Sequence, residues 1–262
     1  MNKGRAPGII VRMKQMFALT FLLTTGIGLH AEILPVWLIP LREAVFEQLL
    51  TADQTRPLYL AATAAARQHT TGANRYLALS RAEFFMGQVL LFEERNPEAR
   101  AHFAEGLRLA EIAVEMAPSA EAWVIRAENL GHLIQADGRR TFAIRHGLDV
   151  GRFAENALAL DGRNAAAQRL LAARYVFAPG VLGNINRGVD MMMAIYNGGG
   201  DMSRDDLFNV TSAIGWGRVQ QRNYSEAIPW LRKALEVYPT NQFATELLEI
   251  AETSDGGRRR SR

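Results

Sequence analysis

The side chains best suited to catalysis or metal binding are scattered through the sequence. None of His69, His102, His132 and His146 stands four residues from another histidine, the spacing that would place two imidazole ligands on one helix face. A metal site would therefore have to be assembled from separate segments. The chain has no cysteine, which excludes a thiolate metal site, a cysteine nucleophile, a disulfide framework and a lipid-modified cysteine.

Other motifs that carry chemistry are also missing. The glycines of residues 198–200 lack the lysine and the preceding strand of a phosphate-binding loop, so they predict a helix end followed by a turn. Ser203, Asp205 and Asp206 are typical of a helix start, with a capping hydroxyl and acids in the first turn. No nucleophile elbow or paired-carboxylate motif is present. The sequence thus predicts a protein that is not an enzyme and uses no cofactor or metal.

The charges are distributed unevenly along the chain. The net charge is +3, yet residues 1–31 carry four basic residues and no acid, and residues 258–262 carry four arginines. The remaining segment, 32–257, therefore has a net charge of −5. A nucleic-acid-binding domain needs a clustered basic face, so we do not expect a nucleic acid partner.

The N-terminus has the pattern of an export signal. Basic residues up to Lys14 precede an apolar run at 16–29, and the small-residue ending Leu29-His30-Ala31 follows. We predict a signal peptide over residues 1–31, cleaved after Ala31, and a periplasmic or secreted protein. Met13 is an alternative start. A second possibility is an uncleaved segment that anchors the chain to the inner membrane, although the run is shorter than the ~20 residues of a spanning helix.

The rest of the chain is predicted to be all-α. Residues 32–40 contain two prolines and predict an extended apolar lead-in. From residue 41 to 252, apolar residues recur at three- and four-residue spacing between regularly placed breaks, which indicates about eleven helices in antiparallel pairs. Residues 253–262 predict a disordered basic tail.

The C-terminal helical pair carries a spaced set of small residues. Gly215 is followed after twelve residues by Ala227, and then come Leu231, Ala234 and Pro239 at intervals of four, three and five. This spacing resembles the tetratricopeptide repeat, in which small residues let two helices cross closely and a proline ends the unit. The family's tryptophan and tyrosine are replaced by Thr211 and Arg218.

Earlier segments repeat the pattern less completely. An N-terminal unit has Gly87, Ala99 and Phe103 at the same intervals, and a middle unit has Trp123 and Ala127. Both units contain additional residues, eleven of them near 138–146 in the middle one. The resemblance implies a right-handed solenoid, because each helical pair can bury its apolar face only against the next pair.

In this family the first helix of each pair lines a concave face, so the resemblance implies a binding groove. The positions offset from the packing residues are Phe84, Gln88, Glu128, His132, Arg169, Asn209, Ser212, Trp216 and Gln220. Each could equally be solvated or packed against a neighbouring helix. The family's clamp for C-terminal carboxylates needs lysine and asparagine where Ser212 and Trp216 stand, so we do not expect that binding mode.

We therefore expect a non-catalytic periplasmic scaffold that binds an unidentified protein or peptide. The alternative is a solute-binding accessory of a TRAP-type transport system, although that family's lipid-modifiable cysteine is absent. A single pocket formed by Trp216, His132 and the irregular loop 177–188 would favour the solute. An open groove would favour a peptide.

Overall fold

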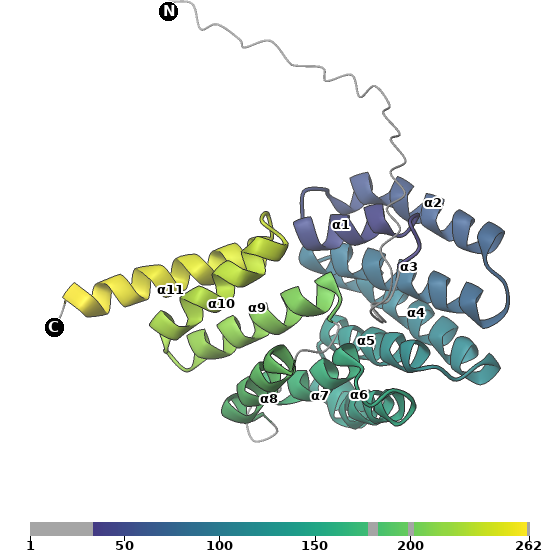
Figure 1. Cartoon of the computed structure of the whole chain (residues 1–262). Coiled ribbons are helices and arrows are strands. Elements are labelled where there is room, and N and C mark those ends of the chain that lie inside the picture. Colours follow the sequence, from purple (N-terminus) through teal and green to yellow (C-terminus); the bar gives the residue numbers. More distant parts are fainter. Residues whose placement is uncertain (1–33, 178–182, 199–201, 261–262) are drawn as a thin grey trace, which may run out of the picture. The chain divides into compact units, whose positions relative to one another are not determined.

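The computed structural model describes residues 34–177, 183–198 and 202–260, and within them every element of regular structure is a helix (Figure 1). The predicted signal segment, its cleavage point and the centre of the 177–188 loop lie outside these residues. The eleven helices of the described part are α1 (Ile39–Glu47), α2 (Ala52–His69), α3 (Gly72–Phe92), α4 (Asn96–Met116), α5 (Ala120–Asp137), α6 (Arg140–Leu160), α7 (Ala165–Phe177), α8 (Ile185–Asn197), α9 (Arg204–Gln220), α10 (Tyr224–Val237) and α11 (Gln242–Arg260). The prediction of an all-α chain of about eleven helices is confirmed.

Local signals set the helix boundaries. Thr51 caps α2 in a capping box with Gln54, in which each side chain bonds the other residue's backbone N–H. The Oγ atom of Ser119 accepts from the backbone N–H of Ala122, and that of Ser203 accepts from the N–H of Asp206. These bonds satisfy N–H groups that have no partner within the first turn of a helix.

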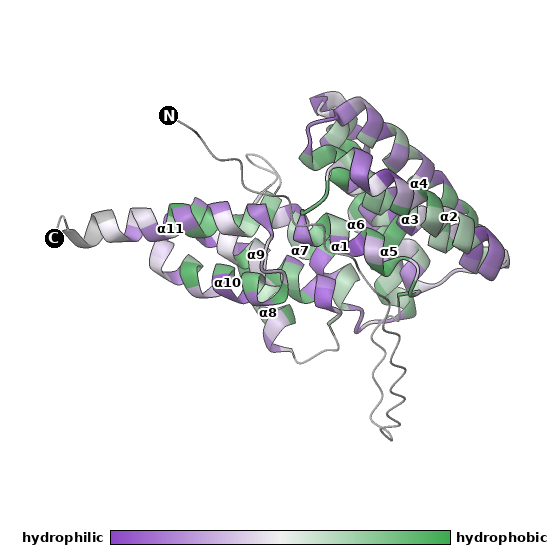
Figure 2. Cartoon of the chain, turned by 90° about the horizontal axis from the view of Figure 1, so that it is seen from above, coloured by the Kyte–Doolittle hydropathy of each residue, from purple (hydrophilic) through white to green (hydrophobic). Residues whose placement is uncertain are grey.

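The helices form two layers. Each helix packs against the next one in the chain, and the second-neighbour pairs with extended contact are all between odd-numbered helices, from α1 with α3 to α9 with α11. The odd-numbered helices therefore form one layer and the even-numbered helices the other, as in an array of helical repeats. Figure 2 shows hydrophilic and hydrophobic residues intermixed along the helices. The middle of α3 and of α9 is buried over consecutive residues, as expected for a helix that is packed on several sides.

Small residues allow the closest helix crossings. A Cβ atom added to Gly215 of α9 would lie 2.5 Å from Cδ2 of Leu231 in α10. A Cβ added to Gly87 of α3 would lie 2.7 Å from Cε1 of Phe103 in α4. Both distances are far below ordinary van der Waals contact, so only glycine allows these helices to approach so closely. Ala99, Ala127, Ala227 and Ala234 are fully buried alanines within the same layers.

Helix α1 ties the first repeats to the last. Its Phe46 ring stacks on Tyr238 with 4.7 Å between ring centroids and meets Phe208 edge-on at 5.6 Å. The Asn241 side-chain amide donates to the Phe46 carbonyl oxygen at 2.8 Å. Asn241 lies 195 residues after Phe46 in the chain. The rings of Phe46, Phe208 and Tyr238 belong to one buried cluster with side chains of α3 and α4.

Two segments differ from the sequence prediction. The lead-in becomes helical at Ile39, because Pro40 occupies the first turn, where no N–H is needed. Before it, the Leu38 N–H donates to the Pro35 carbonyl oxygen at 2.8 Å, and Leu38 is fully buried. The C-terminal helix α11 runs to Arg260, although a disordered tail was predicted from residue 253. Buried Ala251 holds the helix on the core, and regular backbone geometry continues beyond it.

No helix in the described part is both long and apolar enough to cross a bilayer.

Candidate functional site

The predicted groove residues all lie on odd-numbered helices. Phe84 and Gln88 are in α3, Glu128 and His132 in α5, Arg169 in α7, and the other four in α9. Their surroundings differ, however. Phe84, Gln88 and Ser212 are buried, five of the others are partly buried, and Gln220 is exposed. This layer is therefore a packed interior over much of its length.

Arg169 is the centre of an ionic chain that joins three helices. Its guanidinium donates to Glu128 of α5 and, at 3.1 Å, to Asp206 of α9. The side chains of Arg169 and Glu128 are only 12% and 14% exposed. Burial by itself would lower the pKa of Arg169, but the two carboxylates outweigh it and raise the pKa. Breaking the chain would leave buried charges without partners, so it fixes the spacing of α5, α7 and α9.

A second polar cluster lies at the start of α9. The Tyr238 hydroxyl donates to Asp205, and Nε of Arg42 in α1 lies 3.8 Å from the same carboxylate. Burial raises the pKa of Asp205, although Tyr238 and Arg42 partly oppose this rise. Arg204 completes the cluster by donating to the Val237 carbonyl oxygen at 2.8 Å. These contacts anchor α1 to the C-terminal repeats.

His132 is held within an aromatic environment. Its ring centroid lies 5.0 Å from that of Phe84 and 5.4 Å from that of Phe103. Its Nδ1 donates to the Glu128 carbonyl oxygen at 3.0 Å. Burial lowers the pKa of His132, so the neutral ring is favoured at neutral pH. Trp216 has separate surroundings, since it packs on Phe177 with 4.9 Å between ring centroids.

A further cluster combines a carboxylate with a phenol and an imidazole. Glu83 of α3 accepts hydrogen bonds from the Tyr59 hydroxyl and from Nδ1 of His102, each at 2.6 Å. Burial, followed by the bond to Glu83, raises the pKa of Tyr59. The three groups satisfy one another and join α2, α3 and α4. Among the described residues, no three carboxylate or imidazole side chains are grouped as metal ligands.

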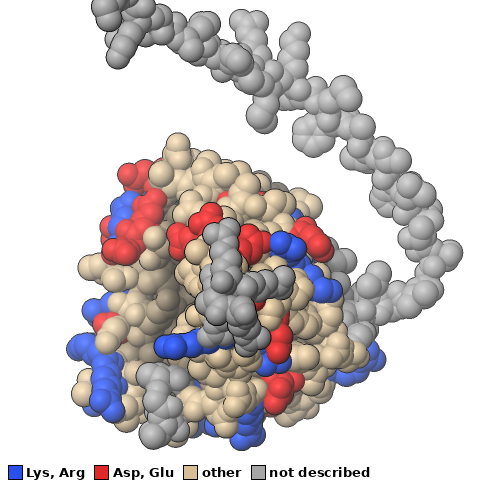
Figure 3. Space-filling model, turned by 90° about the vertical axis from the view of Figure 1, so that its left-hand side faces the viewer, with Lys and Arg blue, Asp and Glu red and all other residues tan. Residues whose placement is uncertain are grey.

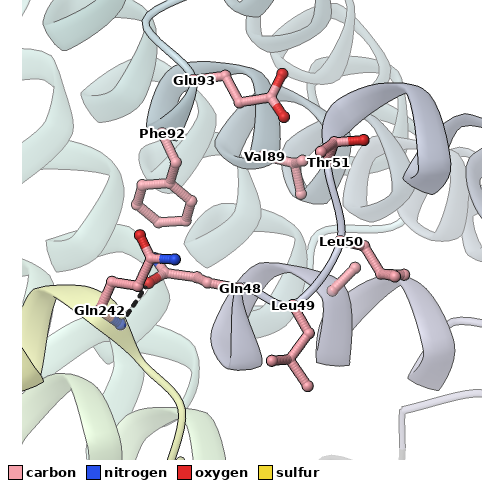
Figure 4. Close-up of a pocket in the computed structure, with 9 residues that line it drawn as sticks. Gln48, Leu49, Leu50, Thr51, Val89, Phe92, Glu93 and Gln242 are labelled. Carbon is pink, nitrogen blue, oxygen red and sulfur yellow. Dashed lines mark hydrogen bonds between the residues drawn. The ribbon is translucent and has the colours of Figure 1, made fainter. Parts of the chain in front are cut away.

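Among the described residues, an opening with accessible apolar groups lies where α1 turns into α2 (Figure 4). Its volume is about 200 Å³, and it is lined by Ala44, Gln48, Leu49, Leu50, Thr51, Val89, Phe92, Glu93 and Gln242. Leu49 is 68% exposed and Phe92 is 50% exposed, so both apolar side chains are accessible to a ligand. Figure 4 shows Phe92 extending from the end of α3 toward Gln48 and Gln242.

Hydrogen bonds fix the rim of this opening. The Gln242 N–H donates to Oε1 of Gln48 at 2.7 Å, and the Ala52 N–H donates to Oε1 of Glu93 at 2.7 Å. Gln48 adopts a left-handed backbone conformation with φ of 53°, which reverses the chain at the end of α1. This opening was not predicted from the sequence, although the adjacent leucines Leu49 and Leu50, just before the capping residue Thr51, were a signal.

Comparisons with known proteins give no further assignment. No protein-family model matches the chain, and no curated protein matches it.

Proposed function

We propose that this chain is a non-catalytic, exported scaffold of tetratricopeptide type that binds a segment of another polypeptide. The two-layer packing and the glycines at the α3–α4 and α9–α10 crossings support the repeat type. The leader-like pattern of residues 1–31 supports the periplasm. Cell fractionation with an epitope-tagged chain would test the location, and recovery in the cytoplasm would overturn it.

The observation that carries the proposed binding role is the opening between the α1–α2 turn, α3 and α11. Leu49, Leu50 and Phe92 offer apolar contact there, and Gln48 and Gln242 offer amide groups beside them. Apolar side chains that remain in solvent next to amides suit a peptide, whose side chain can enter while its backbone pairs with the rim.

The volume of the opening favours a peptide over a small solute. Pockets for small molecules commonly enclose about 300–1,000 Å³, whereas this one holds about 200 Å³. In the layer of odd-numbered helices, Arg169 is already neutralised by two carboxylates, so it is a poor receptor for an anionic solute. Neither the opening beside Phe92 nor the surroundings of Arg169 therefore supports the solute-binding alternative.

The test is a selection of displayed peptides on the purified chain, followed by measurement of Kd by fluorescence anisotropy. Phe92→Glu should weaken the selected peptides at least about tenfold, because a central aromatic contact commonly contributes that much. Leu60→Glu is the matched control, since Leu60 is exposed on α2 and does not line the opening.

If both variants bound the selected peptides equally well, the peptides would not bind at this opening. Failure to select any peptide, together with a large thermal shift caused by one small solute, would replace the proposal with the solute-binding function.

A further inference from the structure

The N-terminal half of α6 extends beyond the buried part of the array. The buried residues of α6 are Gly151, Phe153, Ala154 and Ala157, and all of them lie in its C-terminal half. Within 140–150 no side chain is fully buried. The additional residues that the sequence places near 138–146 thus lengthen one helix of the even-numbered layer and leave its outer face uncovered.

This outer face carries two aliphatic side chains between two arginines. Ile144 is 64% exposed and Leu148 is 76% exposed, and they lie one turn apart. At about 100° per residue, Arg140 lies roughly 40° to one side of Ile144, and Arg145 lies roughly 60° beyond Leu148 on the other side. The aliphatic pair is therefore flanked by a guanidinium group on both sides.

These two arginines have no ionic partner within the described part of the chain. The neighbouring Arg139 and Arg152, by contrast, each contact an aspartate, at 2.7 and 2.9 Å. The nearest acidic residue, Asp149, stands one turn past Arg145, but its carboxylate contacts Arg152 at 2.9 Å and His146 at 3.7 Å. Glu155 lies about two turns past Leu148. The exposed face thus has uncompensated positive charge next to apolar surface.

A partner helix fits this face poorly. A coiled-coil seam needs apolar positions over three or four heptads, whereas this stripe has two residues. A second copy fits no better. Antiparallel pairing that joins Ile144 to Leu148 places Arg140 opposite Arg152 and Arg145 opposite Gly147, so neither arginine has a carboxylate directly opposite. Parallel pairing places each arginine opposite its own equivalent, which is repulsive.

We propose that this face of α6 docks on the surface of an anionic phospholipid bilayer. Ile144 and Leu148 enter the boundary between headgroups and acyl chains, while Arg140 and Arg145 reach the phosphates from both sides. A broad negative surface can satisfy both flanks at once. This inference is independent of the peptide-binding role, which uses a different surface.

The absence of cysteine allows a direct test on the full chain. Gly147→Cys places a single thiol on the same half of α6, where a Cβ atom meets nothing within 4 Å, and an environment-sensitive dye such as NBD is attached there. Leu160→Cys, at the other end of α6 and 54% exposed, carries the control dye. Vesicles of phosphatidylglycerol and phosphatidylethanolamine are compared with vesicles of phosphatidylcholine.

We expect a blue shift and a rise in emission for the dye at position 147 with anionic vesicles, and little change at position 160 or with phosphatidylcholine. The double variant Arg140→Gln/Arg145→Gln should weaken partition roughly 30-fold, since each arginine near an anionic leaflet contributes about fivefold. The double variant Ile144→Ser/Leu148→Ser should abolish the blue shift. Arg108→Gln/Arg232→Gln, in which two exposed arginines on other helices are replaced, should change neither.

Three results would overturn the proposal. Equal responses at positions 147 and 160 would mean that another segment, such as the N-terminal apolar run, makes the membrane contact. If the Arg140→Gln/Arg145→Gln variant partitioned onto anionic vesicles as strongly as the unsubstituted chain, the two arginines would not bind the phosphates. A response to a soluble acidic helical peptide without any response to vesicles would assign the face to a protein partner.

Discussion

Replacing Gly215 with alanine adds one methyl group at the crossing of α9 and α10. The new Cβ atom would lie 2.5 Å from Cδ2 and 2.6 Å from Cγ of Leu231, whereas ordinary contact begins at 3.4 Å. Leu231 is fully buried, so it cannot move into solvent. Overpacking of this kind costs about 1–3 kcal/mol.

Alanine also has the higher helix propensity, which returns up to about 1 kcal/mol. The expected net change for Gly215→Ala is therefore a loss of roughly 0–2 kcal/mol. The control is Gly131→Ala in α5, where a Cβ atom meets nothing within 4 Å, and this variant should gain up to about 1 kcal/mol. The two substitutions are chemically identical, but only one of them encounters a neighbouring helix.

A double-mutant cycle isolates the contact. Leu231→Ala alone should cost about 2–5 kcal/mol, because it leaves a cavity. In that background Gly215→Ala no longer meets Leu231 and should become neutral or stabilising, which corresponds to a coupling of about 1–3 kcal/mol. Urea unfolding followed by circular dichroism at 222 nm measures all four corners. If Gly215→Ala stabilised the chain as much as Gly131→Ala, or if the coupling were zero, the close-crossing argument would be refuted.

Two further predictions concern the layer of odd-numbered helices. Arg169→Ala leaves Glu128 and Asp206 without their shared partner, so the free energy of unfolding in urea should fall by about 3–5 kcal/mol. The control Arg232→Ala breaks an exposed ion pair and should cost less than about 1 kcal/mol. Similar costs for the two variants would contradict the ionic chain. The lowered pKa of His132 means that the unfolded chain binds more protons below its ordinary pKa of about 6.5, so stability should fall as pH drops from 6.5 toward the folded-state pKa. His132→Phe should make urea midpoints less dependent on pH in that range, and an unchanged profile would contradict a neutral, enclosed ring.

The sequence determined the helices because the signals that start and stop them act over a few residues. Thr51, Ser119 and Ser203 each precede a helix and cap it with a short side chain. Gly138 ends α5 with φ of 68°, a conformation that glycine adopts without strain. Pro57 and Pro229 show the limit of such signals, since both lie inside helices that continue through them.

The sequence also located the close crossings at Gly87 and Gly215, because twelve-residue spacing between small residues reports the geometry of one helical pair. It did not reveal the equally close approaches at Gly188 and Gly217. It placed Glu128 and Arg169 in the layer of odd-numbered helices as well. It could not show that Arg169 would meet Asp206, 37 residues later, instead of a ligand. That pairing depends on how α7 and α9 lie against each other.

Only the tertiary structure decided which segments distant in sequence would meet. The contact of Phe46 with Tyr238, the opening beside Phe92 and the uncovered face at Leu148 follow from how much each helical pair rotates relative to the last. A capping or crossing signal fixes one turn or one pair, whereas a small rotation repeated over several pairs determines whether the first and last repeats touch. The sequence therefore specified the helices and helical pairs of this protein. The way in which these pairs pack against one another specified which of their surfaces remain accessible.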